Sequence, residues 1–249
     1  MEHTPFQRPL TLDSSESSGK LTGEIYARID RPFGVVAAGL GAPADWCELL
    51  ILPFNVKLCH ASGTAEDPHL LLRVGRKYDQ PAEDAYPLEL SYRVKQRGAD
   101  YLAVQLEADK GPFGTSDYRI LLEVAALDET RSLLHLAYSS AFDLAGRLAL
   151  QVYLATAGHD KVGFTITGSH ADGEPVYIRG MRGLIERNTM RYYLAVEAHL
   201  CALSEPPEAR FEKSLETWFD ETERYSRQLH EMDRPTYLAM KRGEHPQTQ

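Results

Sequence analysis

The segment "MRGLIERNTMRYYLAVEAHL" (residues 181–200) carries a helical period that the segments directly before it lack. Apolar, small and a few polar residues recur at steps of three and four, which places them on one face of a helix. These residues are Met181, Leu184, Ile185, Asn188, Tyr192, Ala195, Val196 and His199. We therefore expect one long helix here, with this face turned toward the rest of the fold.

The chain before this helix reads as strand after strand. Seven short segments rich in Leu, Val and Tyr follow one another between residues 55 and 168. Turn residues separate several of them, as in "RGAD" (97–100) and "LDET" (127–130). Short strands with tight turns between them indicate an antiparallel meander. The segment 144–156 fits either a strand or a helical insertion.

The N-terminal region combines a polar lead-in, a strand and two short helices. Residues 1–20 are Ser-rich near their end and are expected to form an extended or mobile lead-in. "KLTGEIYARID" (20–30) alternates apolar and polar residues, which predicts a strand with one buried face. Two short helices are expected after it, separated by "GAP" (41–43) and ended by Pro53.

The C-terminal region has its own amphipathic pattern. Phe211, Leu215, Trp218 and Phe219 fall at helical steps between many charged residues. A solvated helix packed by its Trp218 and Phe219 edge is the default interpretation, and a regulatory lid or partner-binding helix is the alternative. The predicted organisation is a lead-in (1–20), a main domain (21–203) and a C-terminal amphipathic helix with its tail (204–249).

This order of elements predicts an α+β fold in which helices are segregated from an antiparallel sheet. A curved sheet closed by one long helix commonly encloses a cavity. On the element order and the helix at 181–200, the chain resembles the START-like superfamily (SRPBCC, helix-grip fold) over roughly residues 20–203. It is also similar to uncharacterised bacterial proteins that carry a "PF…WC…NVK.C" pattern. The matching residues here are Pro32, Phe33, Trp46, Cys47, Asn55, Val56, Lys57 and Cys59.

The resemblance implies a mostly apolar pocket between the sheet and the long helix. Its ligand would be a lipid, a sterol or a polyaromatic molecule, bound or transferred. The expected ligand-contacting residues are Asn188, Tyr192, His199, Arg119, Tyr138, Leu184 and Phe164. The alternative for the helix residues is plain core packing, although a buried amide such as Asn188 needs hydrogen-bond partners.

An enzyme on the same fold is the second hypothesis. Glu123 and His135 would form an acid/base pair if their strands align and both side chains point inward. No G-x-S-x-G motif is present to anchor hydrolase chemistry of that kind. Because no motif supplies a reaction, we favour binding over catalysis. A third interpretation is an interaction protein whose cavity has collapsed into core.

The three cysteines raise the question of a disulfide. Cys47 lies in the second short helix and Cys59 on the strand after it, so the chain can turn back to bring them together. Two buried thiols are the alternative, and the resemblance to the "WC…NVK.C" pattern favours the bridge. A bridge would indicate an oxidising compartment such as the periplasm. The N-terminus "MEHTPFQRPL" lacks a signal-peptide pattern, so a cytoplasmic location is the default.

Composition argues against several other classes of function. The net charge of −9 and the absence of a Lys/Arg cluster argue against a broad nucleic-acid-binding face. Apolar runs are shorter than the roughly 20 residues that a membrane span needs. The Cys and His spacing does not suit zinc, so neither a metal nor another cofactor is expected.

Overall fold

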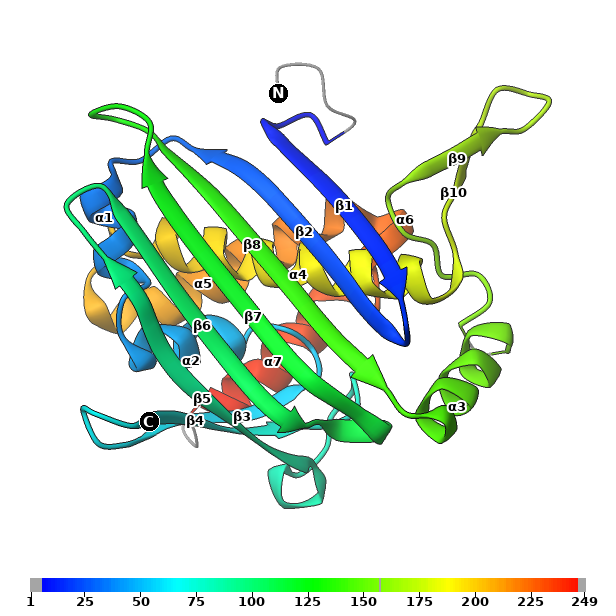
Figure 1. The fold of residues 1–249 in the computed structure, drawn as a ribbon, viewed down its shortest axis with the longest axis horizontal. Coiled ribbons are helices and arrows are strands. Elements are labelled where there is room, and N and C mark those ends of the chain that lie inside the picture. The colour runs from blue at the N-terminus through cyan, green and yellow to red at the C-terminus, as the bar shows by residue number, and fades with distance from the viewer. Residues whose placement is uncertain (1–5, 157, 246–249) are drawn as a thin grey trace.

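The computed structural model describes residues 6–156 and 158–245. Within them, eight antiparallel strands form one sheet in the order β1-β2-β8-β7-β6-β5-β4-β3 (Figure 1). The strands are β1 (Leu10–Ser17), β2 (Lys20–Ile29), β3 (Val56–Gly63), β4 (Pro68–Val74), β5 (Tyr86–Arg97), β6 (Tyr101–Lys110), β7 (Thr115–Ala126) and β8 (Ser132–Phe142). Strands β3 to β8 are neighbours in the chain and in the sheet, which confirms the predicted meander.

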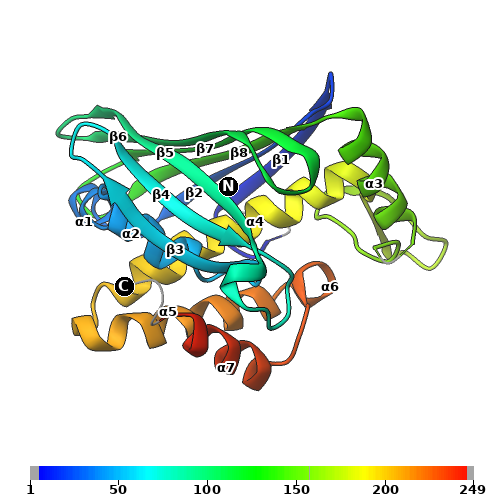
Figure 2. The same cartoon turned by 90° about the horizontal axis from the view of Figure 1, so that it is seen from below.

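The helices lie on one side of this sheet. The predicted long helix is α4 (Gly180–Ala202), and it crosses the inner face of the sheet (Figure 2). The other helical elements are α1 (Phe33–Gly39), α2 (Pro43–Leu50), η1 (Ala82–Asp84), η2 (Pro112–Gly114), α3 (Leu144–Ala155), α5 (Pro207–Glu223), α6 (Ser226–Leu229) and α7 (Arg234–Glu244). Together they confirm the α+β, helix-grip class: an antiparallel sheet closed by one long helix, with two short helices near its start and extra helices at its end.

Alternation along the strands decides which face is inside. In β8, Leu134, Leu136 and Tyr138 are buried against the helices, whereas the residues between them lie on the outer face. Neighbouring β7 repeats the pattern with Leu122 and Val124. Since side chains alternate between the two faces of a strand, this register places every second residue of both strands toward α4.

The N-terminal lead-in contributes more than was expected from its composition. Residues 10–17 form β1, which pairs with β2 along its whole length and adds an edge strand to the sheet. Leu10 is fully buried, and the hydroxyl of Ser14 donates to Glu186 on α4 at 2.6 Å. The Ser-rich sequence fits this place because an edge strand leaves most of its side chains exposed or half-buried.

Two segments after β8 depart from the strand pattern. The ambiguous segment 144–156 forms helix α3. The last expected strand does not join the sheet: β9 (Ile166–Ser169) pairs with β10 (Pro175–Tyr177) in a separate hairpin that projects from the body (Figure 1). All four residues of β9 are exposed, so this strand buries no apolar face that could hold it against the sheet.

Helix α4 is buried on more sides than one amphipathic face would require. Figure 2 shows α5 and α7 on the side of α4 that faces away from the sheet. Trp218 of α5 is fully buried, and its indole N–H donates to the backbone oxygen of Arg191 at 3.1 Å. The predicted edge of Trp218 and Phe219 therefore packs as expected, and α4 forms the middle layer of three.

Cys47 of α2 and Cys59 of β3 are joined by a disulfide, with 5.1 Å between their Cα atoms. Of the two alternatives that the sequence left open, the bridge is the observed one. It fastens α2 to the edge of the sheet beside the buried Trp46. Among the helices in the described ranges, no single one is long and apolar enough to span a membrane; α1 and α2 pass that test only together, with an 82° bend between them.

Candidate functional site: a cavity between the sheet and α4

A cavity of about 390 Å³ lies between the inner face of the sheet and α4. Its walls come from the sheet, from the connection after β4, from α3 and from α4. The lining residues are Leu21, Phe54, Asn55, Val74, Gly75, Arg76, Lys77, Pro112, Thr115, Tyr118, Tyr138, Ser140, Phe142, Gly146, Leu150, Leu184, Ile185, Asn188 and Arg191. This volume falls in the range of small-molecule sites in proteins.

Most of the wall is apolar or aromatic. Three tyrosines form a row, with 5.5 Å between the ring centroids of Tyr118 and Tyr138 and 5.1 Å between those of Tyr138 and Tyr192. Burial raises the pKa of all three phenols, most clearly for Tyr138, so they remain protonated at neutral pH. Tyr118 and Tyr138, which line the cavity, therefore present aromatic surface with neutral hydroxyl groups to it.

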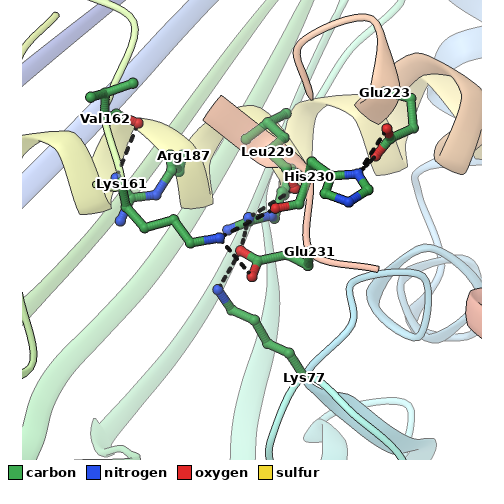
Figure 3. Close-up of polar contacts among 9 residues, drawn as sticks. Lys77, Lys161, Val162, Arg187, Glu223, Leu229, His230 and Glu231 are labelled. Atoms are coloured by element: carbon green, nitrogen blue, oxygen red, sulfur yellow. Dashed lines mark hydrogen bonds and ion pairs between the residues drawn. The ribbon is translucent and has the colours of Figure 1, made fainter. Parts of the chain in front are cut away.

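One end of the cavity is cationic. Lys77, from the connection after β4, and Arg191, from α4, both line the cavity and both contact the carboxylate of Glu231 at 2.6 Å. Lys161 reaches the other oxygen of Glu231 at 3.0 Å (Figure 3). We call Lys77, Lys161, Arg191 and Glu231 the cavity cluster. It joins four segments that are far apart in the sequence.

Within the cavity cluster, the surroundings favour the charged form of Glu231 and disfavour the charged form of Lys77. Burial lowers the pKa of Lys77 to about 8, and the charge of Arg191 acts in the same direction. Burial alone would raise the pKa of Glu231, but the charges of Arg191 and Lys77 outweigh it and lower the value to about 2. Glu231 is therefore ionised at neutral pH, while Lys77 loses its proton more easily than an exposed lysine does.

Several predicted residues lie at this cavity. Leu184, Asn188 and Tyr138 line it directly. Tyr192 lies behind Tyr138 and reaches the site through the ring contact described above. The helical stripe on α4 therefore predicted part of the wall.

Other predicted residues lie elsewhere. The imidazole Nε2 of His199 donates to the backbone oxygen of Gly39 at 2.8 Å, and burial lowers its pKa. Phe164 packs on Phe6, with 5.6 Å between ring centroids, in the contact between the segment before β9 and the N-terminal segment. Arg119 is half exposed on the outer face of the sheet. The structure does not bring these three to the cavity. For His199, periodicity cannot tell which of several buried sides of α4 faces the sheet, and for Arg119, alternation along β7 cannot tell which face of the sheet is inside.

Glu123 and His135 do meet, but on the opposite face. They are directly paired residues of β7 and β8, with 2.7 Å between Oε2 of Glu123 and Nδ1 of His135. Tyr26 stacks on His135, with 4.2 Å between ring centroids, and the hydroxyl of Tyr101 donates to Glu123. The acid/base pair considered from the sequence therefore belongs to the outer face of the sheet, away from the cavity.

The cavity cluster was missed by sequence reasoning. Lys77, Lys161 and Glu231 lie in polar connections, where charged residues are ordinarily solvated. Arg191 lies beside Tyr192 on a helix whose second buried side is set by α5. The available signal was a charged residue, Arg191, inside the otherwise apolar and aromatic stretch 190–196, and it does not identify a partner.

A larger groove of about 850 Å³ runs beside α2 and the turn after β3. Glu66 and Val94 on its rim are exposed, and the groove lies at the surface rather than between the sheet and α4. Among the described residues, no group of three His, Cys, Asp or Glu side chains is placed to hold a metal ion. The cavity under α4 is therefore the candidate site.

Comparison with known proteins gives only distant similarities. No protein-family model and no curated protein matches the sequence. A conserved protein of unknown function from Enterococcus faecalis is similar in structure at 10% identity and a TM-score of 0.39, over 88% of this chain and 92% of that chain. Norcoclaurine synthase from Thalictrum flavum is similar at 12% identity and a TM-score of 0.38, over 58% of this chain and 85% of that chain. The ZhuI aromatase/cyclase from Streptomyces sp. R1128 is similar at 14% identity and a TM-score of 0.37, over 82% of this chain and 94% of that chain. Similarities this distant carry no argument about what the chain binds.

Proposed function

We propose that the protein binds a mostly apolar small molecule in the cavity between the sheet and α4. The observation that carries this proposal is the cavity itself, about 390 Å³ in volume and walled mainly by aliphatic and aromatic side chains. Burying apolar ligand surface against such walls contributes about 25 cal/mol per Å². The amide of Asn188 and the hydroxyl of Ser140 add polar groups that can orient the ligand.

Binding fits the geometry better than the enzymatic alternative does. A cyclase- or hydrolase-like reaction was expected to use an inward pair of Glu123 and His135, and that pair lies on the outer face. The polar groups in the described part of the cavity wall are amides, hydroxyls and cations. These groups suit recognition and orientation of a ligand.

A neutral fluorescent probe tests the proposal. Nile red should bind the wild-type protein with increased emission, and the cavity-filling variant Leu184→Trp should bind it at least about tenfold more weakly, which corresponds to 1.4 kcal/mol. Leu71→Trp is the matched control, because Leu71 is exposed on β4 and lies outside the cavity wall. Thermal unfolding of both variants checks that they fold. No binding by the wild type, or equal binding by Leu184→Trp, would overturn the proposal.

A further inference from the structure

The cationic end of the cavity indicates more about the ligand than its apolar walls do. Lys77 and Arg191 belong both to the cavity wall and to the cavity cluster, so two cationic residues border the ligand space. Arg76, beside Lys77, also lines the cavity. The apolar walls are complementary to the apolar body of an amphipathic anion, and the cationic end is complementary to its charged group.

The cluster holds more cations than its carboxylate can neutralise. Glu231 is the one carboxylate that Lys77 and Lys161 contact within the described ranges, and it also forms an ion pair with Arg191. The two lysines alone exceed its single negative charge. Arg191 and Glu231 are 6% and 10% exposed, so this part of the cluster is largely withdrawn from water, and uncompensated positive charge beside it is costly. A ligand anion would relieve that cost.

The donors of Lys77 are available for such an anion. An ammonium group carries three N–H donors, and within the described residues Lys77 donates only to Glu231. Its side chain is 39% exposed and borders the cavity. Figure 3 shows its amine directed at Glu231, which lies in the segment between α6 and α7. An anion bound beside Glu231 would accept the remaining donors without displacing it.

We infer that the ligand is an apolar carboxylic acid, bound with its carboxylate at Lys77 and Arg191 and its apolar body between the sheet and α4. This inference rests on the proposed function and adds the chemical class of the ligand. Carboxylates suit these residues because charge-assisted hydrogen bonds to ammonium and guanidinium groups are about twice as strong as neutral ones.

Displacement of Nile red by three probes of equal chain length tests the inference: decanoate, decanol and decylamine. At neutral pH, decanoate should displace the dye at about tenfold lower concentration than decanol, and decylamine should be the weakest. Lys77→Met should reduce the advantage of decanoate, with Arg191 retaining part of it, and leave decanol unchanged. Lys95→Met is the matched control, since Lys95 is exposed on β5 outside the cavity wall.

Two further readouts separate charge recognition from a change in cavity shape. Glu231→Gln should strengthen decanoate binding several-fold, because it removes the negative charge that competes for the same cations. The advantage of decanoate should also fade as the pH rises above about 8, where Lys77 loses its proton while Arg191 stays charged. Because Arg191 keeps its positive charge at Glu231, the loss should be partial.

The outcomes distinguish this inference from the proposed function. Equal displacement by decanoate and decanol, or displacement by none of the three probes, would overturn the inference that the ligand is a carboxylic acid. Nile red binding would then still support an apolar site. Failure of the wild type to bind Nile red would overturn the proposed function itself, and the inference with it. An unchanged decanoate advantage in Lys77→Met would also contradict the inference.

Discussion

Two groups of lysines in this protein each share a carboxylate, and their surroundings give them different consequences. Beside the cavity cluster there is a sealed cluster made of Lys57, Lys241 and Glu244. The two lysines contact separate oxygens of Glu244, at 3.0 Å and 2.7 Å, and both have fully buried side chains. Lys77 of the cavity cluster, in contrast, is 39% exposed and borders the cavity.

The difference lies in which groups accept the other hydrogen bonds that the lysine ammonium groups donate. Lys57 donates to the backbone oxygens of Phe54 at 3.1 Å and Tyr78 at 2.9 Å, and Lys241 donates to that of Val56 at 2.7 Å. Backbone acceptors therefore surround the sealed cluster and fasten α7 to β3. Lys77 has only Glu231 within the described residues. The same residue types fasten two elements where the lysines are fully buried and the backbone accepts their hydrogen bonds, whereas the partly exposed Lys77 keeps donors for the proposed ligand.

The largest expected effect is on the sealed cluster. Glu244→Gln should lower the free energy of unfolding by about 3 to 5 kcal/mol, because it leaves two buried lysines without a counter-charge. Urea unfolding measures the loss. Glu212→Gln is the surface control: Glu212 pairs with Arg242, both side chains are more than 40% exposed, and its loss should stay below about 1 kcal/mol.

Glu231→Gln completes this comparison. It should cost clearly less stability than Glu244→Gln, and added sulfate should recover part of the loss, because a solute anion can reach the cavity cluster through the exposed side of Lys77. Sulfate should not recover Glu244→Gln beyond its general effect on the wild type. Equal losses in the two variants, with equal responses to sulfate, would break the distinction between the clusters.

The disulfide should have the next largest effect. Replacing Cys47 and Cys59 together by Ser removes a bridge between residues 12 apart in the sequence, and this should lower the free energy of unfolding by about 2 to 3 kcal/mol. A reductant should lower the melting temperature of the wild type but not that of the double variant. Nile red binding at the folded state should stay unchanged, because neither cysteine lines the cavity.

Cys201→Ser serves as the control for this change, because Cys201 is free and only partly buried. Its melting temperature should stay close to that of the wild type. A wild-type protein whose unfolding ignores reductant would contradict the bridge. Lost dye binding in the folded double variant would show that α2 shapes the cavity.

The smallest effect is expected on the outer face of the sheet. Glu123→Gln should cost less than about 1 kcal/mol at neutral pH, because the side chain is about a third exposed, and it should leave Nile red and decanoate binding unchanged. The hydrogen bond from Tyr101, followed by that from His135, lowers the pKa of Glu123 below its usual 4.5. The stabilisation is therefore present above about pH 4.5 and is lost as the pH falls through the lower folded value.

Urea unfolding at neutral pH and again in acid measures this dependence, and the wild type and the variant should converge in acid. Glu129→Gln, in the exposed turn between β7 and β8, is the surface control. A loss of ligand binding in Glu123→Gln would contradict the separation of the two faces of the sheet and would revive a catalytic or binding role for this pair.

Much of the fold could be predicted because it is written in local periodicity. The helical steps from Met181 to His199 give α4, and the alternation and turns from residue 55 onward give the meander. The breaks at 41–43 and at Pro53 give α1 and α2. Each of these patterns depends on which face of a single element must be buried, and neighbouring residues alone carry that information.

Tertiary structure decided the features that depend on partners distant in sequence. The Ser-rich β1 is a strand because β2 offers it a ladder, and β9 leaves the sheet because it buries nothing there. Glu123 and His135 lie opposite each other on β7 and β8, but α4 packs on the other face of the sheet, so the pair lies on the outer face, away from the cavity.

The cavity cluster is the clearest case of this kind. Lys77, Lys161, Arg191 and Glu231 look like ordinary solvated charges one at a time, and nothing in their local sequence marks them as neighbours. Only the folding of the 75–81 connection and of the segment between α6 and α7 against α4 brings them together at one end of the cavity. The sequence by itself determined an apolar-lined scaffold, and the tertiary structure determined its charge, because electrostatic interactions depend on distance in space.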